Sequence, residues 1–128
     1  MIAKVASKPR PEARDGIILA EAVRRIGEYW HLTNEGLGEI LGLSGSTVSR
    51  LRNGTWQFPA GSKSFELAQY LVRLFRSLDS LMGSDDAASR SWLQAENLEL
   101  AARPLDLIRS IRGLSMVADY VDDFRARV

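Results

Sequence analysis

The sequence predicts an all-α fold in which a helix-turn-helix is followed by a small helical domain. Residues 33–54, TNEGLGEILGLSGSTVSRLRNG, have the pattern of two short helices that meet across a fixed turn. Leucines recur four and three residues apart from Leu67 to Leu81, as they do along one face of a long helix. Beyond residue 84 the pattern stays helical, in shorter segments.

Length and composition fit this fold and exclude several classes of protein. The 128 residues suit one compact unit or two small ones that share a core. The net charge of +1 gives no strong basic field, so DNA binding would need a local patch and two copies of the domain. The absence of cysteine excludes a disulfide framework, thiolate catalysis and a cysteine metal site. Apolar runs are too short for a membrane span or a signal peptide, so we expect a cytoplasmic protein.

Residues 1–14 are predicted to form a mobile basic arm, because lysine and arginine alternate there with proline. Such an arm either lies along DNA phosphates or does nothing. Asp15 then caps the first helix of a helix-turn-helix domain at residues 15–61. Apolar residues of that helix recur at helical spacing and would cover the motif from behind; they are Leu19, Val23, Ile26 and Trp30. His31 follows, and we interpret it as a polar residue at the helix end, not as a metal ligand.

The helix-turn-helix is recognised by its caps and its turn. Thr33 and Ser44 are residues that cap helices, and Gly42 lies where a left-handed residue must end the first helix. Gly38 lies where the two helices would cross most closely, so a bulky side chain there would clash.

One face of the second helix is predicted to contact DNA. Val48 and Leu51 are three residues apart and would point to the core, which leaves the opposite face to polar side chains. The predicted DNA-binding residues are Ser44, Ser46, Thr47, Ser49, Arg50 and Asn53. Only Arg50 is long enough for a bidentate contact to guanine, so we expect modest specificity. The alternative is an ordinary helical corner without a ligand, because a fold alone does not establish a function.

Residues 62–83 are predicted to form a long helix that begins near Ser62 and connects the two domains, after a loop that Trp56 and Phe58 fill. Its leucine repeat is similar to a short coiled-coil stripe, part of which is expected to contact a second copy of the chain. The predicted dimer residues are Leu67, Leu71, Leu74 and Leu78. The alternative is that the stripe belongs to the core of a single chain.

Residues 84–128 make up the predicted C-terminal domain. Its segment ASRSWLQAENLELAARPLDLIRSIRGLSMVADYVDDF contains residues at a distinctive spacing, namely Trp92, Leu93, Asn97, Leu100, Arg103, Pro104, Gly113 and Val117. In these residues the segment resembles the C-terminal toxin-binding domain of the Xre/MbcA/ParS antitoxin family, and ParS-type members are the most similar. Together with the Xre-like helix-turn-helix, the resemblance covers nearly all of the chain after the arm.

The segment departs from the family in two places. Ala101-Ala102 stands where family members often have glycines, and Leu98 stands where proline is common. Because alanine favours a continuous helical turn, the backbone is expected to differ there.

The resemblance implies an antitoxin that pairs with a RES-domain toxin, an enzyme that consumes NAD either by degrading it or by transferring ADP-ribose to a protein. It further implies that the C-terminal end of the antitoxin obstructs the NAD pocket of the toxin. The residues at that end are Phe124, Arg125, Arg127 and Val128. Arginine suits this role, because the pocket could offer acceptors and an acidic catalytic group to a guanidinium. From composition alone, the same residues would be a solvated terminus.

Catalytic constellations are absent from the sequence. It contains no nucleophile with a partner base, no histidine pair, no phosphate-binding glycine loop and no acidic cluster with metal-ligand spacing. We therefore expect no enzymatic activity, metal or cofactor, and we interpret Asp85-Asp86 and Asp122-Asp123 as solvated. Two alternatives stay open. One is a DNA-binding regulator whose C-terminal half only dimerises it, without a toxin partner, and the other is an antitoxin that does not bind DNA.

Overall fold

Seven helices account for most of the chain that the structure describes, as the predicted all-α fold class requires. The computed structural model describes the backbone of residues 11–127 and the side chains of residues 14–127. In chain order the helices are α1 (Pro11–Tyr29), α2 (Asn34–Leu41), α3 (Gly45–Asn53), α4 (Lys63–Leu81), α5 (Asp86–Gln94), α6 (Pro104–Leu107) and α7 (Ile111–Arg127). Extended pairing within residues 11–127 is limited to an isolated bridge between Asn97 and Ala102.

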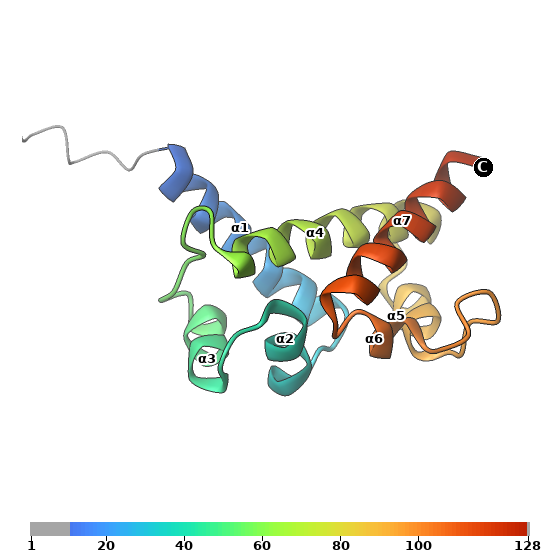
Figure 1. Ribbon diagram of the computed structural model, residues 1–128, viewed down its shortest axis with the longest axis horizontal. Helices are drawn as coiled ribbons and strands as arrows, with labels where there is room; N and C mark the ends of the chain where they lie inside the picture. Colours follow the sequence, from blue (N-terminus) through green and yellow to red (C-terminus); the bar gives the residue numbers. More distant parts are fainter. Residues whose placement is uncertain (1–10, 128) are drawn as a thin grey trace, which may run out of the picture.

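Helix α4 is the centre of the arrangement (Figure 1). Helices α1 and α2 pack against it, and α7 crosses it with the largest interface between any two helices of the described chain. In Figure 1, α2 lies below the first half of α4, α3 lies beside α2 and beyond the start of α4, and α5 and α6 lie below the other half of α4. One hydrophobic core runs through both halves, so the helix-turn-helix and the C-terminal helices form one packed body.

The leucine stripe of α4 is buried within a single chain, and the predicted dimer contact through it is wrong. Leu71, Leu74 and Leu78 expose none of their surface, and Leu67 exposes 8%. The stripe is wide because α4 is covered from two sides, by α1 and by α7. A second chain could touch these leucines only if the fold opened, so core packing explains the repeat.

Helix α1 begins at Pro11, before the predicted cap at Asp15. Proline suits the first turn of a helix, because the N–H that it lacks would have no helical partner there and its φ is already helical. Residues 11–14 of the predicted arm are therefore helical, and residues 1–10 lie outside the described residues. The apolar residues predicted for this helix face the core: Val23 and Ile26 of α1 and Trp30, which follows it, are buried, and Leu19 is half-buried. They pack chiefly against α4 and to a smaller extent against α3.

The helix-turn-helix has the predicted caps and turn. The side chains of Thr33 and Ser44 accept hydrogen bonds from backbone N–H groups in the first turns of α2 and α3, at 2.9 and 3.2 Å. Gly42 ends α2 with a φ of 68°. A Cβ on Gly38 would lie 2.8 Å from the carbonyl oxygen of Leu43, so a side chain there would push the turn away from α2.

Candidate functional site

The predicted DNA-binding residues share the outer face of α3. Val48 and Leu51 are fully buried and fix the rotation of the helix. Of the predicted set, Thr47 is half-buried, whereas the others are exposed, namely Ser44, Ser46, Ser49, Arg50 and Asn53. The structure therefore brings the whole set together on one surface.

A chain of hydroxyl groups orients Arg50 along this face. The Ser44 hydroxyl donates to Thr47 Oγ1 at 2.9 Å, and Arg50 Nη2 donates to the same oxygen at 3.2 Å. Thr47 thus positions the arginine, and the guanidinium keeps further N–H groups for a ligand. The sequence did not predict this role, because it depends on the rotamers of three neighbouring side chains.

Arg52, on the inner side of α3, has a structural role instead. Its Nη2 donates to the carbonyl oxygen of Leu32 at 2.5 Å, which ties α3 to the segment between α1 and α2. Its guanidinium also lies 3.4 Å from the position that a Cβ on Gly27 would occupy, so it packs against α1. Arg52 is consequently unsuited to reach a base.

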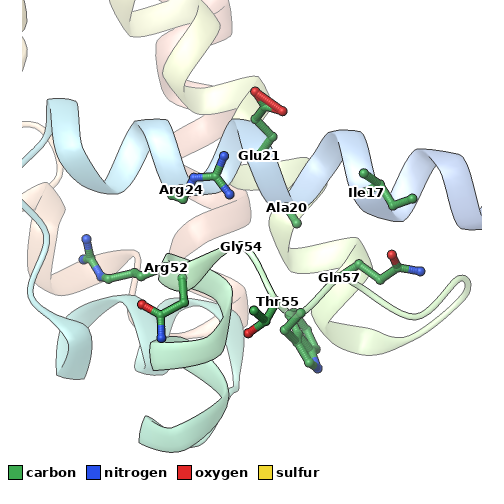
Figure 2. A pocket seen from close by; sticks show the side chains of 10 residues that line it. Ile17, Ala20, Glu21, Arg24, Arg52, Gly54, Thr55 and Gln57 are labelled. Atoms are coloured by element: carbon green, nitrogen blue, oxygen red, sulfur yellow. The ribbon is translucent and has the colours of Figure 1, made fainter.

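A groove of about 720 Å³ opens beside the C-terminal end of α3, between α1 and the following loop. Figure 2 shows its lining residues, which are Ile17, Ala20, Glu21, Arg24, Arg52, Asn53, Gly54, Thr55, Trp56 and Gln57. Glu21 forms an ion pair with Arg25 at 3.0 Å, and none of the carboxylates in residues 14–127 pairs with Arg24. The groove thus places a cation next to Asn53, a residue of the predicted DNA-binding face.

Most of the family-motif residues of the C-terminal domain build the fold. Leu93 and Val117 are core residues, and Pro104 is buried at the start of α6. A Cβ on Gly113 would lie 1.9 Å from the carbonyl oxygen of Leu107, so only glycine permits α6 and α7 to meet this closely. Arg103 is the exposed member.

Arg103 is held by the carboxylate of Asp106, to which its Nε and Nη2 donate at 3.0 and 2.9 Å. The hydrogen bonds to Arg103 hold the pKa of Asp106 below its ordinary value. This ion pair joins the N-cap residue of α6 to its first turn, where no side chain caps the helix.

The segment from Asn97 to Ala102 forms a tight turn, and the expected continuous helical turn is wrong. Asn97 Oδ1 accepts from the N–H of Leu100 at 3.0 Å, and the Asn97 carbonyl oxygen accepts from the N–H of Ala101 at 2.8 Å. Ala101 adopts a φ of 61°. Asn97 thus accepts two backbone hydrogen bonds within the turn, one through its side chain and one through its carbonyl oxygen. These bonds outweigh the helix propensity of alanine.

The predicted toxin-blocking residues lie in the last turn of α7, which extends to Arg127. Phe124, Arg125 and Arg127 are exposed there, and Val128 lies outside the described residues. Arginines near the end of a helix interact favourably with its dipole, which explains why the helix continues so far. The structure therefore presents these side chains from a helix.

An ion-pair cluster fixes this end of α7 to α4. Arg73 Nε donates to Asp122 Oδ2 at 2.8 Å, Arg73 Nη2 donates to Asp119 Oδ1 at 2.5 Å, and the Ser77 hydroxyl also donates to Asp122. Partial burial lowers the pKa of Arg73. The two carboxylates raise it by more, so the pKa lies above its ordinary value. The prediction of a solvated Asp122 is thus wrong, whereas Asp123 is exposed.

Three aromatic side chains form a row along α7 and α5; Trp92 and Phe124 are predicted site residues, whereas Tyr120, which lies between them, was not predicted. The rings of Trp92 and Tyr120 are stacked with centroids 6.5 Å apart, and the ring of Phe124 lies 6.3 Å from that of Tyr120. The Tyr120 hydroxyl donates to Glu99 Oε1 at 2.5 Å. This bond raises the pKa of Tyr120 above its ordinary value.

The two candidate surfaces lie far apart on the molecule. Figure 1 shows α3 at one end of the long axis and the last turn of α7 near the other. Within residues 14–127, no three His, Asp or Glu side chains converge to hold a metal ion. No helix of residues 11–127 is both long enough and apolar enough to cross a membrane.

Comparison with protein families assigns the two candidate surfaces, on α3 and on α7, to two different domains. Residues 13–73 match the antitoxin Xre-like helix-turn-helix domain, and residues 77–127 match the antitoxin Xre/MbcA/ParS C-terminal toxin-binding domain. No curated protein is significantly similar to the chain. The two matched regions meet within α4, the helix that both halves of the core share. The chain therefore belongs to the Xre/MbcA/ParS antitoxin family, with an N-terminal Xre-like helix-turn-helix and a C-terminal toxin-binding domain.

Proposed function

We propose that this antitoxin acts in a type II toxin–antitoxin system in the cytoplasm, where it inhibits a RES-domain toxin that consumes NAD. The observation that carries the proposal is the exposed last turn of α7, which presents Arg125 and Arg127 from within the matched toxin-binding domain. The RES class of the toxin and the NAD chemistry follow from the resemblance of this domain to ParS-type antitoxins.

Inhibition is proposed to occur by physical obstruction of the toxin's NAD pocket. The Arg73 cluster holds α7 against α4, so the last turn meets the toxin as a pre-organised helix end. Arg125 and Arg127 each offer a planar set of donors, which suits an acidic catalytic group or other acceptors in the pocket. The larger surface of the domain supplies most of the affinity.

The test is NAD turnover by the purified toxin with the full-length antitoxin or with a chain that lacks residues 125–128. We expect the deletion to restore NAD consumption, while a pull-down still recovers much of the complex. Arg127→Glu should act similarly, because a carboxylate has no donors and repels an acidic group. Arg112→Glu, at the exposed start of α7, is the matched control and should leave inhibition intact. Full inhibition by the shortened chain would show that the helix end is dispensable.

We also propose that the antitoxin, alone or with its toxin, binds the operator of its own operon. Helix α3 would enter the major groove with Arg50 toward a guanine, and two copies would contact half-sites about one turn of DNA apart. Because the leucines of α4 are buried, the contact that pairs the copies must use another surface. The short side chains of Ser46 and Ser49 allow a close approach but supply little specificity.

A further inference from the structure

A small apolar pocket lies at the toxin-binding end of the molecule. Its volume is about 250 Å³. The end of α4, α5 and α7 provide its lining residues, which are Leu81, Met82, Trp92, Tyr120, Val121 and Phe124. All of them fall within residues 77–127, the region that matches the toxin-binding domain.

The lining is suited to an apolar side chain. The Tyr120 hydroxyl is already bonded to Glu99, so the pocket offers its ligand chiefly hydrocarbon and aromatic surface. Its volume is below the roughly 300–1,000 Å³ of pockets that hold small molecules, and it lacks the convergent polar groups that orient such ligands. It has the character of a recess for one anchor residue of a protein partner.

Part of the apolar surface around the pocket is open to solvent. Phe124 exposes 45% of its surface although it stacks beside Tyr120. Leu98 exposes 94% and directly precedes Glu99, the residue that binds the Tyr120 hydroxyl. Burial of such surface against a partner is favourable, whereas its exposure in a free chain is not.

We infer that this pocket receives an apolar side chain, aromatic or long and aliphatic, from the surface of the toxin, and that it anchors the complex. The inference rests on the proposed toxin partnership. The toxin is the occupant because Phe124, which lines the pocket, is followed at once by Arg125, so a toxin that covers the last turn of α7 also covers the pocket. The pocket supplies affinity, and the arginines block the enzyme.

Affinity measurements on the full chain test this division. Leu81→Trp fills the recess from within without changing the arginines, and Phe124→Ala removes one wall at an exposed position. We expect each to raise the Kd for the toxin at least tenfold, mainly through faster dissociation. Saturating Leu81→Trp antitoxin should still inhibit completely, because its helix end is intact. Ile111→Trp adds the same ring at a residue that is 63% exposed and lies outside the pocket, so its Kd should not change. Thermal unfolding checks that each variant is folded.

Fluorine NMR gives a second readout that does not depend on any folding defect. Antitoxin labelled with 5-fluorotryptophan has resonances from Trp30, Trp56 and Trp92, and a Trp92→Phe sample assigns the last. Unlabelled toxin should shift the Trp92 resonance and remove its sensitivity to solvent deuterium, while that of Trp56, in the helix-turn-helix domain, stays in place.

Each other outcome overturns the inference in a distinguishable way. A tight complex with an unchanged Trp92 resonance and unchanged Kd values for the variants would show that the pocket is idle. A Trp92 shift that depends on antitoxin concentration without toxin would assign the pocket to a second copy of this chain. Failure of the unmodified antitoxin to bind the toxin at all would remove the toxin partnership itself.

Discussion

At the scale of single residues, Ala101 occupies a backbone conformation that its side chain disfavours. Its φ of 61° lies in the left-handed region, where a Cβ crowds the backbone at a cost of roughly 1–2 kcal/mol. The hydrogen bonds that Asn97 makes across the turn hold it there. The glycines that resembling proteins often have at this position would avoid the strain.

Ala101→Gly should therefore raise the free energy of unfolding by about 0.5–1 kcal/mol, the relief of strain less the added entropy of the unfolded chain. Urea unfolding measures the difference. Ala102→Gly is the matched control, since Ala102 has a negative φ and is half-buried, and its replacement should destabilise the protein. If both changes had the same sign, the conformation of Ala101 would not be the cause.

Two arginines should contribute differently to DNA binding. Arg50→Ala should cost about 1–3 kcal/mol at the operator if Arg50 contacts a base, with little change on random DNA. Arg24→Ala should weaken binding to both DNAs and lower the salt dependence by about one counterion, because a cation in the groove beside Asn53 would meet a phosphate. Gel-shift titrations at several salt concentrations measure both effects.

Arg25→Ala is the control for this pair of substitutions, because Arg25 already forms an ion pair with Glu21. If the unmodified protein and Arg50→Ala bound operator and random DNA with equal affinity, α3 would not be the helix that recognises the operator sequence. An unchanged salt dependence in Arg24→Ala would leave the groove without a role in DNA binding.

At the scale of helices, the stability of α4 comes from neighbours that are distant in sequence. Leu74→Ala should lower the free energy of unfolding by about 2–5 kcal/mol, because it leaves a cavity beneath α1 and α7. The midpoint of unfolding should not depend on protein concentration, as expected for a contact within one chain. Ile111→Ala, at an exposed position, should have little effect. If the midpoint of unfolding rose with protein concentration for the unmodified protein but not for Leu74→Ala, Leu74 would lie in an interface between chains.

The elements that could be predicted from the sequence are those fixed by local interactions. The caps at Thr33 and Ser44, the left-handed Gly42 and the start of α4 at Ser62 each depend on side chains within a few residues. The prediction of a dimer stripe was wrong because the helix that covers it, α7, lies far along the chain. The role of Asp122 was missed for the same reason, since its partner Arg73 is 49 residues away.

At the scale of the whole molecule, the two candidate surfaces lie on one body with a shared core. Ion pairs and hydrogen bonds join the halves: Arg109 binds Glu39 of α2 at 3.0 Å, and Arg90 donates to the carbonyl oxygen of Tyr29 at 2.8 Å. Both contacts cross between the matched domains. The positions of the two surfaces could not be predicted from the sequence, because these contacts and the shared core determine them.

This separation predicts a ternary complex of operator, antitoxin and toxin. In a gel shift with the operator, added toxin should move the antitoxin–DNA band to a slower position, because a toxin bound at the end of α7 leaves α3 uncovered. Arg50→Ala antitoxin saturated with toxin should give no such band. Release of free DNA as toxin is added would show that the two partners exclude one another.

The shared helix α4 limits how this protein can evolve by recombination. A crossover between the two matched regions would join the first part of α4 from one parent to the last turns from another. Helix α7 packs against the buried leucines of α4, where both voids and extra volume destabilise the core. New pairings of operator and toxin are therefore expected to spread by inheritance of whole antitoxin genes, because exchange of halves would disrupt the core that both halves need.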